Sequence, residues 1–287
     1  MIRKPAPAAL PEVHCTEDGT RRYLHLGGTP WVQGSMRINR PFDLDLEYVQ
    51  RMMAWLLFTR PAAVTQGHAV QLGLGAAALT KFCYKRLGMR TTAIEINPQV
   101  VAACRQWFKL PPDNERLRVL IADAASLDWG GRTENRGRTP ISRSETRALT
   151  PILSPTPILS AHPIFRTHPI TALQVDLYDH EAAAPVLDSA EFYAHCRAGL
   201  ADNGVMTVNL FGRHASYTRS LGHIVAAFGA PSVWAFRPTR EGNAVVLAQR
   251  TPEQPTRDEL TQRADDVRMR WGLPAPKWLP VFKPLQA

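Results

Sequence analysis

The chain has 287 residues, of which 45% are apolar and 21% are charged, as in ordinary globular proteins. Its length predicts one large domain, or one domain with an appendage, whose core needs no disulfide or metal to hold it together. The clearest apolar run, residues 52–58, is far shorter than the roughly 18–20 residues that cross a bilayer, and residues 1–7 carry charge without a signal-peptide core. We therefore expect no membrane partner.

The four cysteines are scattered and form no CxxC pair, which argues against a disulfide scaffold and a structural zinc. Free thiols are typical of a reducing compartment, so we expect a cytoplasmic location. The nine histidines show neither HExxH nor zinc-type spacing, so we expect no metal. The net charge of +9 comes without a Lys/Arg run interleaved with aromatic residues, so we interpret it as a solvated basic surface and expect no nucleic-acid partner.

The first sixty residues predict a small β region followed by a helix. Residues 1–20 are rich in proline and polar side chains, and we expect them to be loose. Within 21–60, short strand-like stretches on either side of Gly27-Gly28 predict a β-hairpin. The apolar stripe that follows, between Val49 and Leu57, has helical spacing, and Asp43 or Asp45 is placed to cap that helix.

Residues 61–250 alternate between strand and helix patterns. Strands are expected at 68–73, 90–95, 117–122, 172–177 and 205–210, helices at 76–87, 98–107, 189–200 and up to 228, and a closing hairpin at 232–236 and 244–248. Such alternation implies a parallel sheet with helices on both faces, that is, an α/β fold of the Rossmann type. The small β-hairpin region would precede it.

Two segments fall outside this alternation. In 131–171 a hexamer recurs, with Pro-Ile at 151, 157, 163 and 169, and we interpret the segment as a disordered, low-complexity insertion because regularly spaced proline blocks helix. In 251–287 a capping box, Thr256-Arg-Asp-Glu259, predicts a helix that Gly272 ends, followed by an extended strap that packs on the domain.

Acidic residues and a glycine turn follow the first three strands of the expected sheet. Gly73 and Gly75 lie directly after the first, where glycine lets the backbone approach a ligand closely. Glu95 ends the second strand, where a carboxylate accepts both hydroxyls of a ribose, and Asp123 with Ala124 follows the third. Because the carboxyl ends of parallel strands share one edge, this order predicts an adenosine pocket of the S-adenosylmethionine type.

Two further carboxylates, Asp176 and Asp179, follow the fourth strand three residues apart, with Tyr178 between them. Carboxylates so placed suit an enzyme that holds a cationic amine and removes a proton from it, so that nitrogen becomes a nucleophile. The same spacing also suits a capped turn in which Asp179 bonds local backbone N–H groups. The residues alone leave these two interpretations open.

The sequence resembles the spermidine/spermine synthase family, the polyamine aminopropyltransferases, over roughly residues 21–250 apart from the insertion. The matching pieces are Val32-Gln33, Leu46-Glu-Tyr48-Val-Gln-Arg-Met-Met, Leu72-Gly-Leu-Gly-Ala, Ala93-Ile-Glu95-Ile-Asn-Pro, Ala122-Asp123-Ala124, Asp176-Leu-Tyr-Asp179 and the more widely shared Leu200–Asn209 stretch. The resemblance implies a small N-terminal β domain and a Rossmann-like catalytic domain of the methyltransferase type. It also implies a homodimer.

The resemblance further implies a reaction: transfer of an aminopropyl group from decarboxylated S-adenosylmethionine, as co-substrate, to an amine, with release of methylthioadenosine. No prosthetic group is implied. In the nucleoside half, Glu95 would hold the ribose, Asp123 and Ala124 the adenine, and Gln33 would lie nearby. The glycine turn with Gly73 and Gly75 would complete this half.

In the amine half, the resemblance places Tyr48 and Tyr178 beside the amine, Asp179 as the catalytic base and Asp176 as the group that orients the amine or the aminopropyl chain. This half departs from the family pattern, because the glycine loop carries Ala76 where the family has Asp. Two alternatives therefore stay open: a methyltransferase that uses S-adenosylmethionine on the same fold, and a non-catalytic relative that acts as a binding module.

Overall fold

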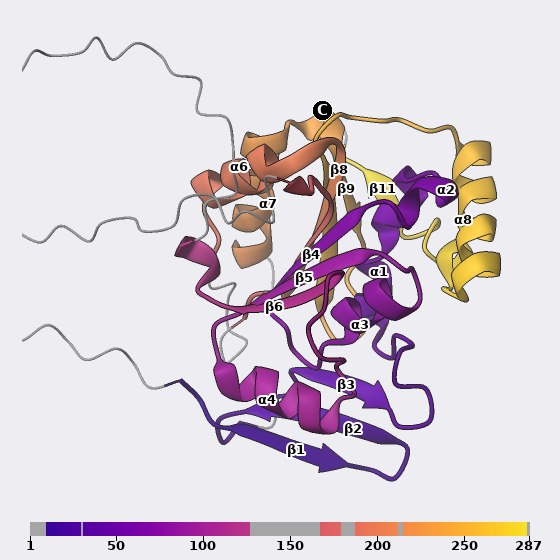
Figure 1. Cartoon of the computed structure of the whole chain (residues 1–287). Coiled ribbons are helices and arrows are strands. Elements are labelled where there is room, and N and C mark those ends of the chain that lie inside the picture. Colours follow the sequence, from indigo (N-terminus) through magenta and orange to yellow (C-terminus); the bar gives the residue numbers. More distant parts are fainter. Residues whose placement is uncertain (1–9, 30, 127–166, 179–186, 212–214, 286–287) are drawn as a thin grey trace, which may run out of the picture.

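The alternating segments fold into one twisted sheet in the computed structural model, which describes residues 10–29, 31–126, 167–178, 187–211 and 215–285 (Figure 1). The strand order is β11-β9-β10-β8-β7-β4-β5-β6. The strands are β4 (His68–Leu72), β5 (Arg90–Glu95), β6 (Leu117–Ile121), β7 (Ile170–Val175), β8 (Leu200–Phe211), β9 (Val233–Phe236), β10 (Asn243–Gln249) and β11 (Phe282–Pro284). Strands β4 to β8 pair in parallel, whereas β10, β9 and β11 add to them antiparallel. The predicted α/β fold with a largely parallel sheet is confirmed.

Helices cover both faces of this sheet (Figure 1). They are α1 (Glu47–Arg51), η1 (Ala54–Phe58), α2 (Pro61–Val64), α3 (Ala78–Lys85), α4 (Pro98–Trp107), α6 (Ala190–Gly199), α7 (Ala215–Phe228) and α8 (Arg257–Trp271). One apolar core joins α1, η1, α3 and α8 to one face, and a second joins α6 and α7 to the other. In the part of the chain that the structure describes, no helix is both long and apolar enough to cross a membrane.

Local signals set several helix ends. The Asn97 side chain accepts the Gln99 N–H and caps α4 at its first proline, and the capping box of α8 forms between Thr256 and Glu259. Gly272 then ends α8 in the left-handed conformation. These positions agree with the sequence prediction because each signal lies within three residues of the helix end that it determines.

A small antiparallel sheet stands beside the carboxyl edge of the large one (Figure 1). It consists of β1 (Val13–Glu17), β2 (Arg21–Leu26) and β3 (Gly34–Arg37), in that order. The predicted hairpin is the β2–β3 pair, but the expectation that residues 1–20 are loose is wrong for β1. The proline and polar residues of this segment do not indicate a strand. Strand β1 forms because five of its residues pair with β2.

The predicted helix after Asp45 is also corrected. Helix α1 ends at Arg51, η1 follows, and neither Asp43 nor Asp45 caps α1. Asp45 instead receives hydrogen bonds from Arg21 and Ser35, so its carboxylate is already bound by the small sheet. The apolar stripe is nevertheless buried as expected, because the α1–η1 break keeps those side chains on the core side.

Residues 127–166, which hold most of the predicted insertion, lie outside the described residues. Strand β7 begins at Ile170, so the last two residues of the expected insertion belong to the sheet. The expected strap after α8 also contributes a strand, since β11 pairs with β9 and the Phe282 ring stacks on Trp234 and Phe236.

The turn after β4 lies very close to the backbone that follows β7. Gly73 has φ of +79°, donates its N–H to Ile94 O of β5 at 2.9 Å, and lies against the backbone of Asp176, which follows β7. A Cβ on Gly73 would lie 2.1 Å from Asp176 O. Only glycine meets both conditions, so this turn can join the ends of three strands.

We expect Gly73→Ala to lower the free energy of unfolding by about 2–5 kcal/mol, since it adds a clash with Asp176 to the strain of a left-handed alanine. The matched control is Gly88→Ala, because Gly88 has a similar φ of +69° but its Cβ would meet only ordinary contacts. The control should cost about 1–2 kcal/mol. Urea unfolding of the two variants measures the difference, and equal losses would contradict the close approach.

Candidate functional site

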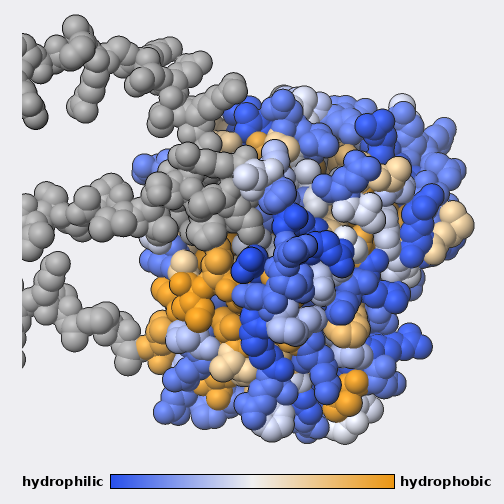
Figure 2. Space-filling view, in the orientation of Figure 1, coloured by the Kyte–Doolittle hydropathy of each residue, from blue (hydrophilic) through white to orange (hydrophobic). Residues whose placement is uncertain are grey.

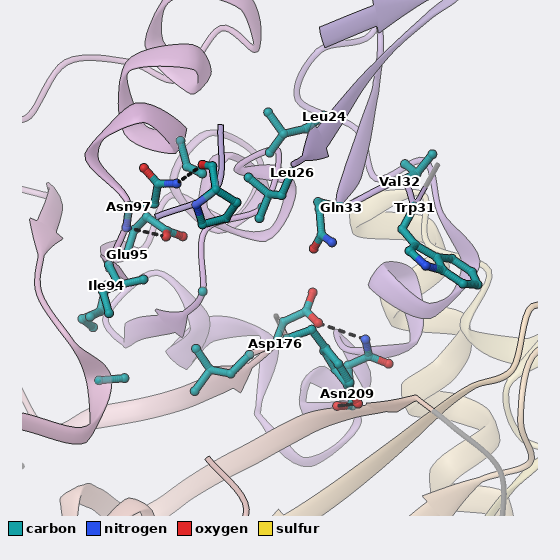
Figure 3. Close-up of a pocket in the computed structure, with 18 of the residues that line it drawn as sticks. Leu24, Leu26, Trp31, Val32, Gln33, Ile94, Glu95, Asn97, Asp176 and Asn209 are labelled. Carbon is teal, nitrogen blue, oxygen red and sulfur yellow. Dashed lines mark hydrogen bonds between the residues drawn. The ribbon is translucent and has the colours of Figure 1, made fainter. Parts of the chain in front are cut away.

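A cavity of about 620 Å³ lies between the small sheet and the carboxyl edge of the large sheet. Its size falls in the range of small-molecule sites. Polar groups from the two sheets converge on it (Figure 3), with Glu95 and Asn97 at one end and Asp176, Asn209 and Gln33 at the other. The first end is called the nucleoside end and the second the amine end below, after the roles that the sequence predicts for them.

Glu95 is the fixed carboxylate of the nucleoside end. Its Oε2 accepts the Leu74 N–H of the glycine turn at 2.8 Å, and its Oε1 accepts the Asn97 N–H at 2.9 Å. Burial raises the pKa of the Glu95 carboxyl, and the backbone N–H bonds oppose that rise because they stabilise the charged form. Each oxygen keeps a further lone pair, so Glu95 can still accept two hydroxyl donors from a ligand.

Asp123 and Ala124 follow β6 at the same end of the cavity. Asp123 Oδ1 accepts the Ala125 N–H at 2.9 Å and starts a short 3₁₀ turn, Ala124–Ser126. The Asp123 side chain is exposed, whereas Ala124 is buried. One carboxylate oxygen therefore holds the turn, and the other is available to a donor in the cavity.

Asp176 is the half-buried carboxylate of the amine end. Its Oδ1 accepts the Asn209 amide at 2.9 Å, and its Oδ2 accepts the Tyr48 hydroxyl at 3.3 Å (Figure 3 shows the Asn209 bond). Burial raises the pKa of Asp176, and the bonds from Asn209 and Tyr48 oppose that rise. Burial and the adjacent Asp176 carboxylate also hold the pKa of Tyr48 well above its usual value, so Tyr48 stays a neutral donor.

Sequence reasoning missed a chain of side chains that continues from Asp176. Asn209 Oδ1 accepts the Asn243 amide at 3.1 Å, and the turn before Asn243 brings Glu241 to the cavity wall. Only the strand pairing brings these residues to the site. Strand β10 is antiparallel to β8, so the first residue of β10 lies beside the last residues of β8. Asn243 and Glu241 can be found only after that pairing is known.

Residues of the β2–β3 loop form the opposite wall. Trp31, Val32 and Gln33 line the cavity, and the Gln33 amide points into it in Figure 3. Gly75, with φ of +49°, passes beneath this loop, and a Cβ on it would lie 3.0 Å from Gln33 O. The glycine turn therefore supports the loop as well as the ends of the strands.

The structure brings most of the predicted site residues together. The cavity is lined by Gln33, Tyr48, Gly73, Gly75, Glu95, Asp123, Ala124, Asp176 and Tyr178. The Tyr178 hydroxyl donates to Asn209 O at 3.0 Å. Asp179, the predicted base, lies outside the described residues, and the roles of the others stay predictions.

The charge of the cavity wall is of one sign. Four carboxylates line it, from Glu95, Asp123, Asp176 and Glu241. Among the described residues of the wall there is no lysine, arginine or histidine. In a chain whose net charge is +9, this local reversal of sign favours a cationic ligand.

Known proteins resemble this chain in sequence and in fold. The polyamine aminopropyltransferase of Neisseria meningitidis serogroup A is 30% identical over 272 residues, which cover 94% of this chain and 88% of that protein. A probable spermidine synthase structure from Corynebacterium glutamicum superposes with a TM-score of 0.61 at 16% identity, covering 91% of this chain and 85% of the other. Human methyltransferase-like protein 13, in complex with SAH, gives 0.60 at 21% identity, covering 79% and 93%. No family model matches the chain.

Asn209→Ala should raise the pKa of Asp176 further, because the hydrogen bond from the Asn209 amide stabilises the charged carboxylate. Tyr48→Phe should raise it less, since the Tyr48 bond is longer and contributes less. Carbon-13 NMR titration of aspartate carboxyls, with Asp176→Asn to assign the resonance, measures both shifts. Asn203→Ala, an exposed position on the same strand, is the control, and an unchanged pKa in Asn209→Ala would contradict the assignment.

Proposed function

Since the chain belongs to the polyamine aminopropyltransferase family and is a transferase, we propose that it moves an aminopropyl group from decarboxylated S-adenosylmethionine to an amine. The observation that carries this proposal is the charge of the cavity wall, four carboxylates with no cationic side chain among its described residues. Both proposed substrates are cations. Methylthioadenosine would be the second product.

The nucleoside end has the acceptors that an adenosine group needs. Glu95 has acceptor capacity left for ribose hydroxyls, because the bonds from Leu74 and Asn97 take one lone pair on each oxygen. Asp123 would accept the adenine amino group beside Ala124, and Gln33 would lie over the sugar. The glycine turn at Gly73 and Gly75 lets the ligand approach the backbone closely.

The same wall favours the decarboxylated nucleoside over S-adenosylmethionine itself. The intact methionine group carries a carboxylate, which would face Asp176 and Glu241 without a lysine or arginine among the described wall residues to pair with it. Burying an unpaired charge beside like charges is costly. Removal of the carboxylate leaves an aminopropyl ammonium, which these acids attract.

The proposed chemistry is an in-line displacement. The lone pair of a neutral amine attacks the methylene carbon beside the sulfonium; a C–N bond forms, the C–S bond breaks, and its electron pair neutralises sulfur. Because sulfonium is a good leaving group, the protein mainly orients the two substrates and removes a proton. Asp176, held by Asn209 and Tyr48, would orient the amine, and Asp179 would take the proton, a role that rests on the family resemblance.

Ala76 is the position at which the glycine loop departs from the family pattern. It is buried and lies close to Gly34, since a Cβ on Gly34 would lie 2.7 Å from the Ala76 Cβ. Ala76 is not part of the cavity wall. We propose that Asp176 and Glu241 provide the negative charge at this end instead. The resemblance adds a homodimer to the proposal, and the free cysteines add a cytoplasmic location.

The proposal is tested by incubating the purified protein with decarboxylated S-adenosylmethionine and a pool of di- and polyamines, followed by mass spectrometry. We expect methylthioadenosine together with one aminopropylated amine, neither of which forms without enzyme. Intact S-adenosylmethionine should give neither product because its carboxylate is unpaired in this cavity.

Asp179→Asn separates the proposed base from binding. It should abolish turnover while methylthioadenosine still binds, because the proposed nucleoside contacts are made by Glu95, Asp123 and Gln33. Full turnover in this variant would exclude Asp179 as the base. S-adenosylhomocysteine and a methylated acceptor formed from S-adenosylmethionine would replace the proposal with the methyltransferase alternative.

Glu241→Gln should raise KM for a diamine acceptor about tenfold and leave KM for a monoamine of the same length unchanged, since only the diamine brings a second ammonium to Glu241. Steady-state kinetics with butane-1,4-diamine and butylamine make this comparison. Glu191→Gln, an exposed position on α6, is the charge-matched control. A parallel rise for both amines would show that Glu241 does not receive the distal charge.

A further inference from the structure

Leu10 and Pro11, shortly before β1, lie at the nucleoside end of the cavity. The Asn97 side-chain amide donates to Pro11 O at 3.0 Å, and Leu10 and Pro11 line the cavity with Glu95 and Asp123. The next residue is also held, because Glu12 O accepts the Gly27 N–H at 2.8 Å. This short segment is therefore fixed against the carboxyl edge of the large sheet.

Asn97 holds three parts of the site at once. Its backbone N–H donates to Glu95 Oε1, its Oδ1 caps α4 by accepting the Gln99 N–H, and its side-chain N–H₂ reaches Pro11. The side chain is buried, so these bonds are shielded from water. The position of the Leu10–Pro11 segment is thereby coupled to the carboxylate that would hold the ribose.

Two large apolar side chains remain uncovered where this segment meets β5. Leu10 is 43% exposed and Ile96, between Glu95 and Asn97, is 51% exposed, although both line the cavity. Figure 2 shows hydrophobic residues gathered on this side of the molecule, where the segment before β1 approaches the ends of β5 and β6. Apolar surface that faces a concave polar site is typical of a wall that a ligand covers.

We infer that Leu10 and Pro11 are part of the nucleoside site and form, with Ile96, the apolar wall against which the adenine ring rests. This inference rests on the proposed function. The ring has two apolar faces and a polar edge, and Asp123 lies at the same end of the cavity to receive the amino group of that edge. Asn97 acts as a positioning residue, because it places the segment without itself needing to contact the ring.

Binding of methylthioadenosine by calorimetry tests the wall. Leu10→Ala removes exposed apolar surface, and Asn97→Ser keeps a good helix cap but is too short to reach Pro11. Each variant should raise the Kd for methylthioadenosine about five- to tenfold. The unfolding midpoint of Leu10→Ala should stay close to that of the wild type, since Leu10 is not in the core, and that of Asn97→Ser should fall only by the loss of the Pro11 bond, because the α4 cap is retained. Met269→Ala, an exposed apolar position on α8, should bind as the wild type does.

A second measurement separates this wall from a general structural effect. With the nucleoside saturating, KM for the amine should be unchanged in Leu10→Ala, because Leu10 lies at the nucleoside end. Wild-type affinity for methylthioadenosine in both variants would overturn the inference and leave the proposed function standing. Failure of the wild type itself to bind methylthioadenosine would overturn the proposed function, and the inference with it.

Discussion

Gly73 leaves β4 with a left-handed backbone, bonds to β5 and lies in contact with the backbone after β7. Because no side chain stands between them, the ends of three strands converge within a few ångströms. Glu95 then lies close enough to accept the N–H of Leu74. Asp176 lies beside the same turn, because its N–H donates to Leu72 O. The turn at Gly73 thus holds the nucleoside end and the amine end of the cavity next to each other, and the backbone geometry of this turn sets the distance between them.

The carboxylates of this protein are of two kinds. Asp45 forms ion pairs with Arg21 and Arg37 and binds the small sheet to the segment before α1. Its negative charge is therefore neutralised within the fold. Among the described residues, Glu95, Asp123 and Asp176 of the cavity have no such cations and are held by neutral donors, namely backbone N–H groups, an amide and a phenol. Neutral donors orient a carboxylate and leave its charge available to a ligand. This difference in partners distinguishes Asp45, a structural acid, from the carboxylates that we propose bind the ligand.

Much of the large sheet could be predicted because its signals are local. Strand β5 and helix α4 have the predicted ends, 90–95 and 98–107, since an apolar β-branched run, a capping Asn97 and Pro98 all lie within a few residues. The candidate carboxylates were found because each follows a parallel strand, and such ends share one edge by topology. No long-range contact had to be known for these assignments.

The features that were missed depend on partners far away in the sequence. Asp45 is not a helix cap because Arg21, twenty-four residues earlier, binds it, and β1 is a strand because β2 pairs with it. Glu241 and Asn243 reach the cavity through the antiparallel pairing of β10 with β8, which strand and helix patterns alone do not indicate. Tertiary pairing overrides local propensity at these positions.

Strand β11 has a consequence for how the chain reaches this structure during synthesis. Strand β9 is covered on one side by β10 and on the other by residues 282–284, so its second edge stays open until those residues have left the ribosome. The open edge carries Trp234 and Phe236, the rings on which Phe282 later stacks. An unpaired apolar edge invites pairing with other chains. In a nascent chain of this protein, the open edge of β9 is therefore a site at which another chain can pair until residues 282–284 dock.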